Sequence, residues 1–299
     1  MQLEEILSEL ENNTGKFPHQ ALERAIEEKE AITPFLLTSL SESKDNLEDL
    51  FNKPDYLLHL YALFLLAQFK EALAYPLIIE FFSVPGDMSL NVTGDVVTED
   101  LSRILASVSH GNIDPIKQLI ENQEVNEYVK GAALRALIIL VVQGIVSREE
   151  IVQYFKEFFS LLFANKSSMN AAEEEPDYIW TELTINGSIL APKELQEYIE
   201  RTFDEDLIEP FFFARDDFDD YLENGSEANL NELRDNPHYS LIEDAISEMK
   251  YWACFEINKP SIFMEPEGFS TSSKKVKSKA KKKKKMQKES RRKNRTKKK

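Results

Sequence analysis

Apolar residues recur at helical spacing in two neighbouring segments near the middle of the chain. In the first segment they fall three and four residues apart, which places them on one face of an α-helix over residues 127–143. That face comprises Val129, Ala132, Ala133, Ala136, Leu137, Leu140 and Val141. The second segment has a similar stripe of Ile151, Phe155, Phe158, Phe159 and Leu162. Between the two helices, Gly144 predicts a turn and Ser147 predicts an N-cap.

A longer period relates these helices to others. Short helical segments begin close to Pro34, Pro76 and Pro115, which are 42 and 39 residues apart. HEAT and armadillo units, each a pair of antiparallel helices, have a period of roughly 40 to 47 residues. Because the missing N–H of proline costs little in the first turn of a helix, each proline is predicted to open the second helix of a pair. The predicted first helices are 56–68, 96–108 and 127–143, and a fourth pair is predicted at 177–190 and 193–204.

The pattern changes toward the C-terminus. An acidic stretch at 215–221 precedes one more helix, predicted over residues 239–255 and interpreted as a cap on the exposed end of the stack. Proline, glycine, serine and threonine then predict a linker at 259–273, and a disordered lysine-rich tail follows at 274–299. The expected fold is therefore all-α, a HEAT/armadillo-like α-solenoid of about five helix pairs over residues 1–258.

Composition supports the all-helical interpretation. The 299 residues are 42% hydrophobic and include nine Gly, which favours long helices around a sizeable core. The most apolar stretches, 57–66 and 132–142, are shorter than the ~18 residues of a membrane span and contain His59 and Arg135. With a single cysteine, Cys254, and no signal-peptide pattern, the sequence predicts a cytoplasmic protein without a disulfide or a cysteine-based zinc site.

Charge divides the chain into two unlike parts. The net charge is −17, but the tail holds 17 of the 36 basic residues and one of the 53 acidic ones, so the tail is +16 and the rest is −33. Closely spaced cations displace condensed counterions from phosphate polymers, so the tail predicts binding of RNA, a ribosome or another polyanion. A solubility tail, a neutralising partner for the acidic body, or a nuclear address in a host cell would give the same pattern. The tail cations are Lys274, Lys275, Lys277, Lys279, Lys281, Lys282, Lys283, Lys284, Lys285, Lys288, Arg291, Arg292, Lys293, Arg295, Lys297, Lys298 and Lys299.

The acidic stretch is a second candidate site. Its spacing lacks the glycine and the twelfth-position glutamate of a calcium loop, so a docking surface for a basic partner is favoured over a cation site. The candidate docking patch comprises Asp216, Asp217, Asp219 and Asp220. The aromatic residues within 155–163 and 211–213 are interpreted as core, and a peptide groove is the alternative if 211–213 are exposed.

Recognised catalytic patterns are missing from the sequence. It has no Gly-rich phosphate loop, no Gly-x-Ser-x-Gly elbow and no His-Glu-x-x-His helix, and its four histidines lack metal-ligand spacing. His110, beside Gly111, is expected to cap a turn between helices. Cys254 lies between Trp252 and Phe255, where apolar surroundings are expected to raise its pKa and keep it inert in the core. No cofactor, metal or catalytic residue is therefore expected.

Several motifs also resemble a known family. They are YPLI at 75–78, GD at 94–95, LSRILA at 101–106, GN at 111–112 and YVKGAALRAL at 128–137. Over about residues 57–159 the chain is similar to a bacterial family of helical-repeat proteins known only as domain of unknown function 1186. The resemblance implies a helical-repeat fold and a bacterial source, and it brings no activity and no catalytic residue.

Together these features predict a non-enzymatic scaffold or adaptor. Its repeat surface would bind another protein, its tail would bind RNA, a ribosome or another polyanion, and no integral membrane segment is expected. One alternative is a secreted bacterial effector that acts in a host cell. Another is an enzyme whose site is built from carboxylates on the concave face. The oligomeric state is left open by the sequence.

Overall fold

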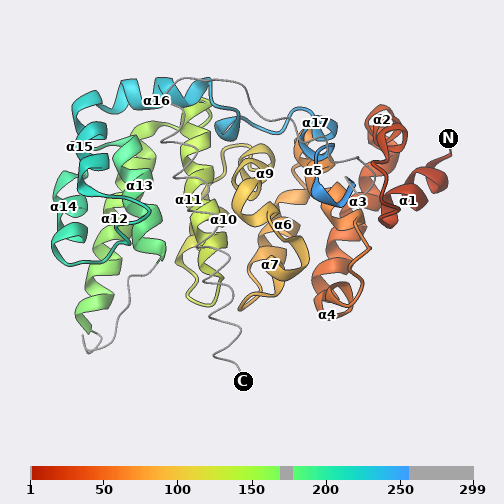
Figure 1. Ribbon diagram of the computed structural model, residues 1–299, viewed down its shortest axis with the longest axis horizontal. Coiled ribbons are helices and arrows are strands. Elements are labelled where there is room, and N and C mark those ends of the chain that lie inside the picture. Colours follow the sequence, from red (N-terminus) through yellow and green to blue (C-terminus); the bar gives the residue numbers. More distant parts are fainter. Residues whose placement is uncertain (1, 169–177, 256–299) are drawn as a thin grey trace, which may run out of the picture. The chain divides into compact units, whose positions relative to one another are not determined.

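The computed structural model describes residues 2–168 and 178–255. Within these ranges the chain forms seventeen α-helices and two short 3₁₀-helices, and it forms no strand (Figure 1). The all-α prediction is confirmed. The predicted linker at 259–273 and tail at 274–299 lie outside the described residues. No helix in the described part of the chain is long and apolar enough to span a bilayer.

The first nine helices lie in the N-terminal 108 residues. They are α1 (Leu3–Glu11), α2 (His19–Glu27), α3 (Lys29–Asp45), α4 (Leu47–Phe51), α5 (Leu58–Gln68), α6 (Ala74–Phe82), α7 (Met88–Thr93), α8 (Val96–Glu99) and α9 (Leu101–Val108). The others are α10 (Asp114–Glu121), α11 (Glu127–Val142), α12 (Arg148–Ser168), α13 (Tyr178–Leu190), α14 (Gln196–Asp204), α15 (Arg215–Asn224), α16 (Ser226–Arg234) and α17 (Ala245–Met249). The two 3₁₀-helices are η1 (Pro237–Tyr239) and η2 (Ala253–Phe255).

Most of the helices predicted from periodicity are present. The segments predicted at 56–68, 127–143, 177–190 and 193–204 correspond to α5, α11, α13 and α14. The segment predicted at 96–108 is divided into α8 and α9 at Asp100, whose φ of −123° departs from helical geometry. Gly144 has a φ of +67°, and the Ser147 hydroxyl accepts a hydrogen bond from the Glu150 N–H at 3.2 Å, so the predicted turn and N-cap before α12 are confirmed.

Two of the three repeat prolines occupy the predicted position. Pro76 and Pro115 lie in the first turns of α6 and α10. The prediction for Pro34 is wrong, because this residue lies inside α3, which begins at Lys29. The Glu28 carbonyl at the end of α2 accepts the N–H of Ile32 at 3.0 Å, so α3 is already established before the proline is reached.

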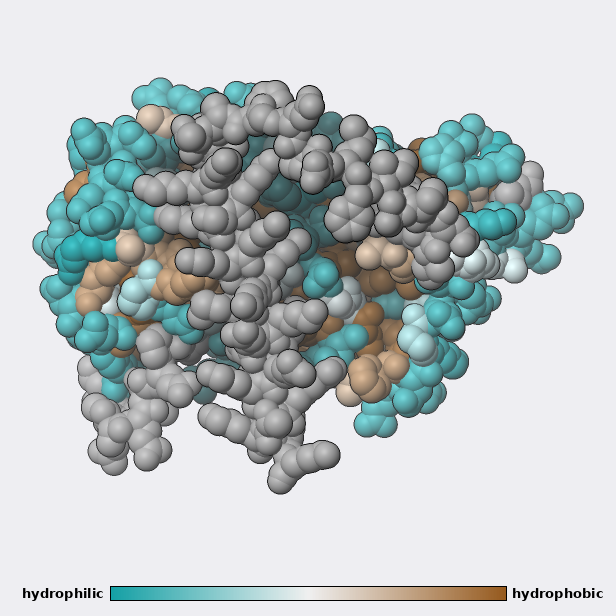
Figure 2. Space-filling model, in the orientation of Figure 1, coloured by the Kyte–Doolittle hydropathy of each residue, from teal (hydrophilic) through white to brown (hydrophobic). Residues whose placement is uncertain are grey.

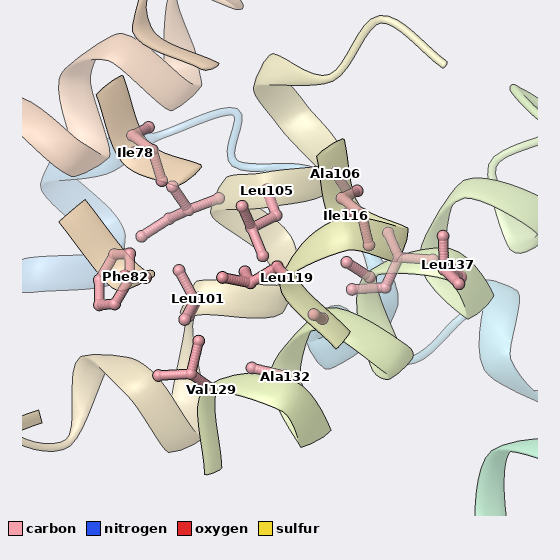
Figure 3. Close-up of a cluster of buried hydrophobic side chains, with 14 of the residues drawn as sticks. Ile78, Phe82, Leu101, Leu105, Ala106, Ile116, Leu119, Val129, Ala132 and Leu137 are labelled. Carbon is pink, nitrogen blue, oxygen red and sulfur yellow. The ribbon is translucent and has the colours of Figure 1, made fainter. Parts of the chain in front are cut away.

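The core is centred on α11. This helix packs against α9, α10 and α13, and the predicted apolar face is buried apart from Val141, which is half-buried. Ile138 and Ile139 are also fully buried, because neighbouring helices cover the other side as well. Figure 3 shows the junction, where side chains of α6, α9 and α10 meet α11. The labelled residues are Ile78, Phe82, Leu101, Leu105, Ala106, Ile116, Leu119, Val129, Ala132 and Leu137.

Hydrogen bonds between helices repeat the period seen in the sequence. Many of them join residues 37 to 42 positions apart. The His110 Nε2 lies 2.8 Å from the carbonyl oxygen of Lys70, and both residues have positive φ in turns that follow α9 and α5. The turn role expected of His110 is confirmed. Other pairs at this spacing are Lys29 with Phe69, Tyr75 with Asn112, Asp87 with Asn126, and Arg148 with Leu190.

The C-terminal part of the described chain differs from the prediction. Residues 237–255, called the return segment here, contain η1, a stretch without regular structure, the five-residue α17 and η2. The predicted helix at 239–255 is wrong, since Ser240 is extended with φ −93° and ψ 160°. The apolar period that suggested a helix is used instead to bury Ile242, Ala245 and Met249 completely.

The return segment is also not a cap on the last helix pair. Figure 1 shows it running from α16 to α17, which packs against α5 and α2. The ring centroids of Phe17 and Phe255 are 5.3 Å apart, so the segment ends beside the beginning of the chain. It therefore crosses several helix pairs in the direction opposite to their order in the sequence.

Replacing a core leucine tests the central position of α11. Leu137 is fully buried on α11, whereas Leu161 on α12 is 44% exposed. Leu137→Ala should lower the free energy of unfolding by about 2–5 kcal/mol, because it removes packed atoms and leaves a cavity. Leu161→Ala, the matched control, should change it by less than about 0.5 kcal/mol. Urea unfolding of both variants measures the difference, and equal losses would contradict this description of the core.

Candidate functional site

The acidic patch predicted from the sequence lies on α15. Asp216, Asp219 and Asp220 are exposed. Asp217 is half-buried, and its Oδ2 accepts a hydrogen bond from the Ala214 N–H at 2.9 Å, which caps the start of the helix. Three of the four aspartates can therefore contact a partner directly. No group of three or more His, Cys, Asp or Glu within the described ranges is arranged to hold a metal ion.

The basic tail residues lie outside the described part of the chain, so the structure places none of the 17 tail cations. On the face shown in Figure 2, hydrophilic residues make up much of the described surface, with hydrophobic residues visible between them.

The aromatic residues divide into core and surface. Phe155, Phe159 and Phe163 are buried as expected, and Phe158 is buried with them. Phe213 is also buried, but Phe211 is 42% exposed, so the core interpretation of 211–213 holds only in part. A lone exposed ring does not make a groove.

Burial shifts the pKa values of His59 and Cys254. Burial lowers the pKa of His59 to about 4, and its Nε2 lies 3.1 Å from the Val92 carbonyl oxygen. Burial also raises the pKa of the Cys254 thiol, as expected, although this residue is half-buried and not fully in the core.

A set of polar side chains that sequence reasoning missed binds the main chain of the return segment. The Gln143 Nε2 donates to the Tyr239 carbonyl at 3.0 Å, and the Arg103 Nε donates to the Ser240 carbonyl at 3.0 Å. Further along, the Ser107 Oγ accepts the Ile242 N–H and the Gln68 Oε1 accepts the Ala245 N–H, both at 2.9 Å. Gln68, Arg103, Ser107 and Gln143 together form the main-chain row.

The main-chain row follows the helical repeat. Gln68 is the last residue of α5, Ser107 is the last but one of α9, and Gln143 directly follows α11. These three positions are 39 and 36 residues apart, close to the proline spacing. Equivalent ends of successive helices therefore contact successive parts of one extended segment. The sequence signal for this was weak, because single Gln and Ser residues at helix ends are common.

Arg103 is the charged residue of the main-chain row. This residue is 4% exposed, and its Nη1 and Nη2 donate to the two carboxylate oxygens of Glu248 at 2.7 and 2.6 Å. Asp100 lies on the other side, with its Oδ1 3.7 Å from the Arg103 Nη1. Burial raises the pKa of Asp100 to about 7, although the nearby guanidinium acts in the opposite direction. One buried cation thus faces two carboxyl groups.

Comparison with known proteins identifies relatives along almost all of the described chain. A family model described as a protein of unknown function (DUF1186) matches residues 1–256. A chain from Chlamydia trachomatis serovar D called "Uncharacterized protein" is 38% identical over 253 residues, which cover 84% of this chain and 96% of that protein. A protein of the same description from Chlamydia muridarum is 37% identical over 253 residues, covering 84% and 97%. No solved structure matches the chain.

The buried carboxyl of Asp100 predicts a pH dependence of stability. Its pKa rises from 3.8 to about 7 on folding, so between these values the folded state binds a proton more tightly than the unfolded state. Stability therefore falls as the pH rises through this window, by an amount on the order of 4 kcal/mol, since one pKa unit corresponds to about 1.4 kcal/mol. Asp100→Asn should remove this loss, so its advantage over the wild type should grow from pH 5 to pH 8.

Urea unfolding across this pH range measures the effect. Asp219→Asn on the exposed patch is the control, and its difference from the wild type should stay nearly constant. An Asp100→Asn difference that also stays constant would contradict the assignment.

Proposed function

Because this chain belongs to the DUF1186 family, whose description assigns no activity, we propose its function from its own residues. The protein is a cytoplasmic, non-enzymatic scaffold. It binds another protein along its helical body and binds RNA or another polyanion through its basic tail. The observation that carries this proposal is the segregation of charge, with −33 in residues 1–273 and +16 in the tail.

The proposed body is a HEAT-like α-solenoid of about five helix pairs. Hydrogen bonds between residues 37 to 42 positions apart support this, because they join each helix pair to the next pair. In such a stack each repeat contacts its neighbours, and an extended surface is left for binding. A surface of this kind suits a protein or peptide partner.

Charge assigns the two binding partners to different parts of the chain. The acidic body repels phosphate polymers, so a polyanion is drawn to the tail. Asp216, Asp219 and Asp220 on α15 expose carboxylates that attract a basic partner. The chain can therefore hold an acidic and a basic partner together, which is the work of an adaptor.

Removing the tail tests the polyanion half of the proposal. A chain that ends at residue 273 keeps the whole span of the family match and lacks all 17 tail cations. Full-length protein should bind polyuridylic acid with an affinity that falls steeply with salt. The logarithm of the binding constant falls with the logarithm of the salt concentration, with a slope of about 0.7 for each single-strand phosphate contacted. The shortened chain should lose this binding. Fluorescence anisotropy of labelled RNA measures both, and unchanged binding by the shortened chain would refute the role of the tail.

Neutralising the acidic patch tests the protein-binding half. In the chain ending at residue 273, a combination of Asp216→Asn, Asp219→Asn and Asp220→Asn should weaken binding of a deca-arginine peptide by about tenfold, because each lost charge contributes up to ~1 kcal/mol. Asp217 is left in place because it caps α15.

The matched control removes three exposed acids elsewhere, with Glu4→Gln, Glu9→Gln and Glu30→Gln. It removes the same amount of negative charge but should weaken binding much less. Isothermal titration calorimetry compares the two sets, and equal losses would mean that net charge matters and the patch does not.

A further inference from the structure

We propose that the main-chain row lines a peptide-binding groove, which the return segment occupies in cis. A partner's peptide that is extended at first and then forms a short helix, as the return segment does before and within α17, can occupy the groove in its place. The partner peptide carries an aliphatic residue, a small residue three positions later and an acidic residue six positions later. This inference deepens the proposed scaffold function by naming the class of partner, and it does not depend on the tail.

The main-chain row recognises the backbone of the segment that it binds. Its four residues contact the carbonyls of Tyr239 and Ser240 and the N–H groups of Ile242 and Ala245. The bond from the Ile242 N–H to Ser107 is buried, where an unpaired backbone group would be costly, whereas the bond from Gln143 to the Tyr239 carbonyl is exposed. Every peptide has such backbone groups, so the row by itself accepts extended segments from other chains. The Ser107 hydroxyl donates its own proton to the Arg103 carbonyl at 2.7 Å, which leaves its oxygen oriented as an acceptor.

The residues of the row recur along the chain. Gln143, Ser107 and Gln68 come from the ends of three successive first helices, α11, α9 and α5. A peptide that crosses them meets one polar side chain at each step, in a direction antiparallel to the order of the helices. The return segment shows that this path accommodates a peptide, because its residues 239 to 245 follow it (Figure 1).

Specificity comes from two apolar positions and one charge. Ile242 and Ala245 are fully buried, so only residues of limited size fit there. Six residues after Ile242, the Glu248 carboxylate accepts two hydrogen bonds from Arg103. The planar guanidinium matches a carboxylate in this bidentate geometry, so the groove selects an acidic side chain at this position.

Asp100 makes release of the return segment feasible. A buried cation left without a partner is strongly destabilising. When Glu248 leaves, the Asp100 carboxyl 3.7 Å from Arg103 can ionise and supply the opposing charge. The return segment has few fully buried side chains compared with α11, so its local opening costs less than unfolding of the core.

The test uses a fluorescein-labelled synthetic peptide of residues 237–255 and full-length proteins. In the wild type the resident segment competes, so the labelled peptide should bind weakly. Glu248→Lys places a cation beside Arg103 and weakens the resident segment, so this variant should bind the labelled peptide at least about tenfold more tightly. Adding Ser107→Ala to that variant removes the acceptor for the Ile242 N–H and should lower the affinity by about fivefold.

One control tests whether binding depends on the peptide sequence, and another tests whether the variants are folded. A peptide carrying Ile242→Asp should not bind to any of the proteins, because it would place a charge in an apolar site. Circular dichroism and thermal unfolding show whether each variant is folded, and Ile242→Asp in the full chain is the second way to release the segment. Hydrogen exchange at Ile242 and Ala245 reports that release directly.

The proposal is overturned if the released variants are folded, exchange rapidly at Ile242 and Ala245, and still do not bind the peptide. It is also overturned if the wild type is a dimer that Glu248→Lys converts to monomers, because the groove would then serve exchange between two copies. Either result leaves the scaffold proposal standing if the acidic patch still binds the deca-arginine peptide, so the two failures are distinguishable.

Discussion

The burial of α11 on all sides is the constraint from which the rest of the structure follows. A helix whose apolar residues extend around its whole circumference is stable only if other helices cover each face. Here α9, α10 and α13 do so. Hydrogen bonds between residues about 40 positions apart link neighbouring helices, a spacing that is consistent with the proposed repeat.

The ends of three helices, α5, α9 and α11, hold the return segment of this chain. Main-chain groups of the return segment are bound by Gln68, Ser107 and Gln143. Arg103 binds the Ser240 carbonyl and also the Glu248 carboxylate. In the proposed peptide site, the backbone contacts supply affinity and the single charge supplies selectivity.

Charge separates the two proposed activities of the protein. An acidic body does not compete with the +16 tail for phosphate polymers, and the exposed aspartates of α15 are available to basic partners. Within the body, the same principle acts at short range around Arg103, where two carboxyl groups face one buried guanidinium. The proposed scaffold therefore combines long-range attraction of its partners by charge with recognition of a carboxylate by one arginine.

The sequence by itself determined the all-α class and most helices, because helical spacing such as that of Val129, Ala133 and Leu137 is a local property. It also located the acidic patch and the turn at His110. Only the tertiary structure decided that Pro34 lies inside α3 and that residues 237–255 cross back over the earlier helices. It also brought Arg103 to Glu248, which is 145 residues away. Such pairings depend on which surfaces meet after folding, and no periodicity within a single segment contains that information.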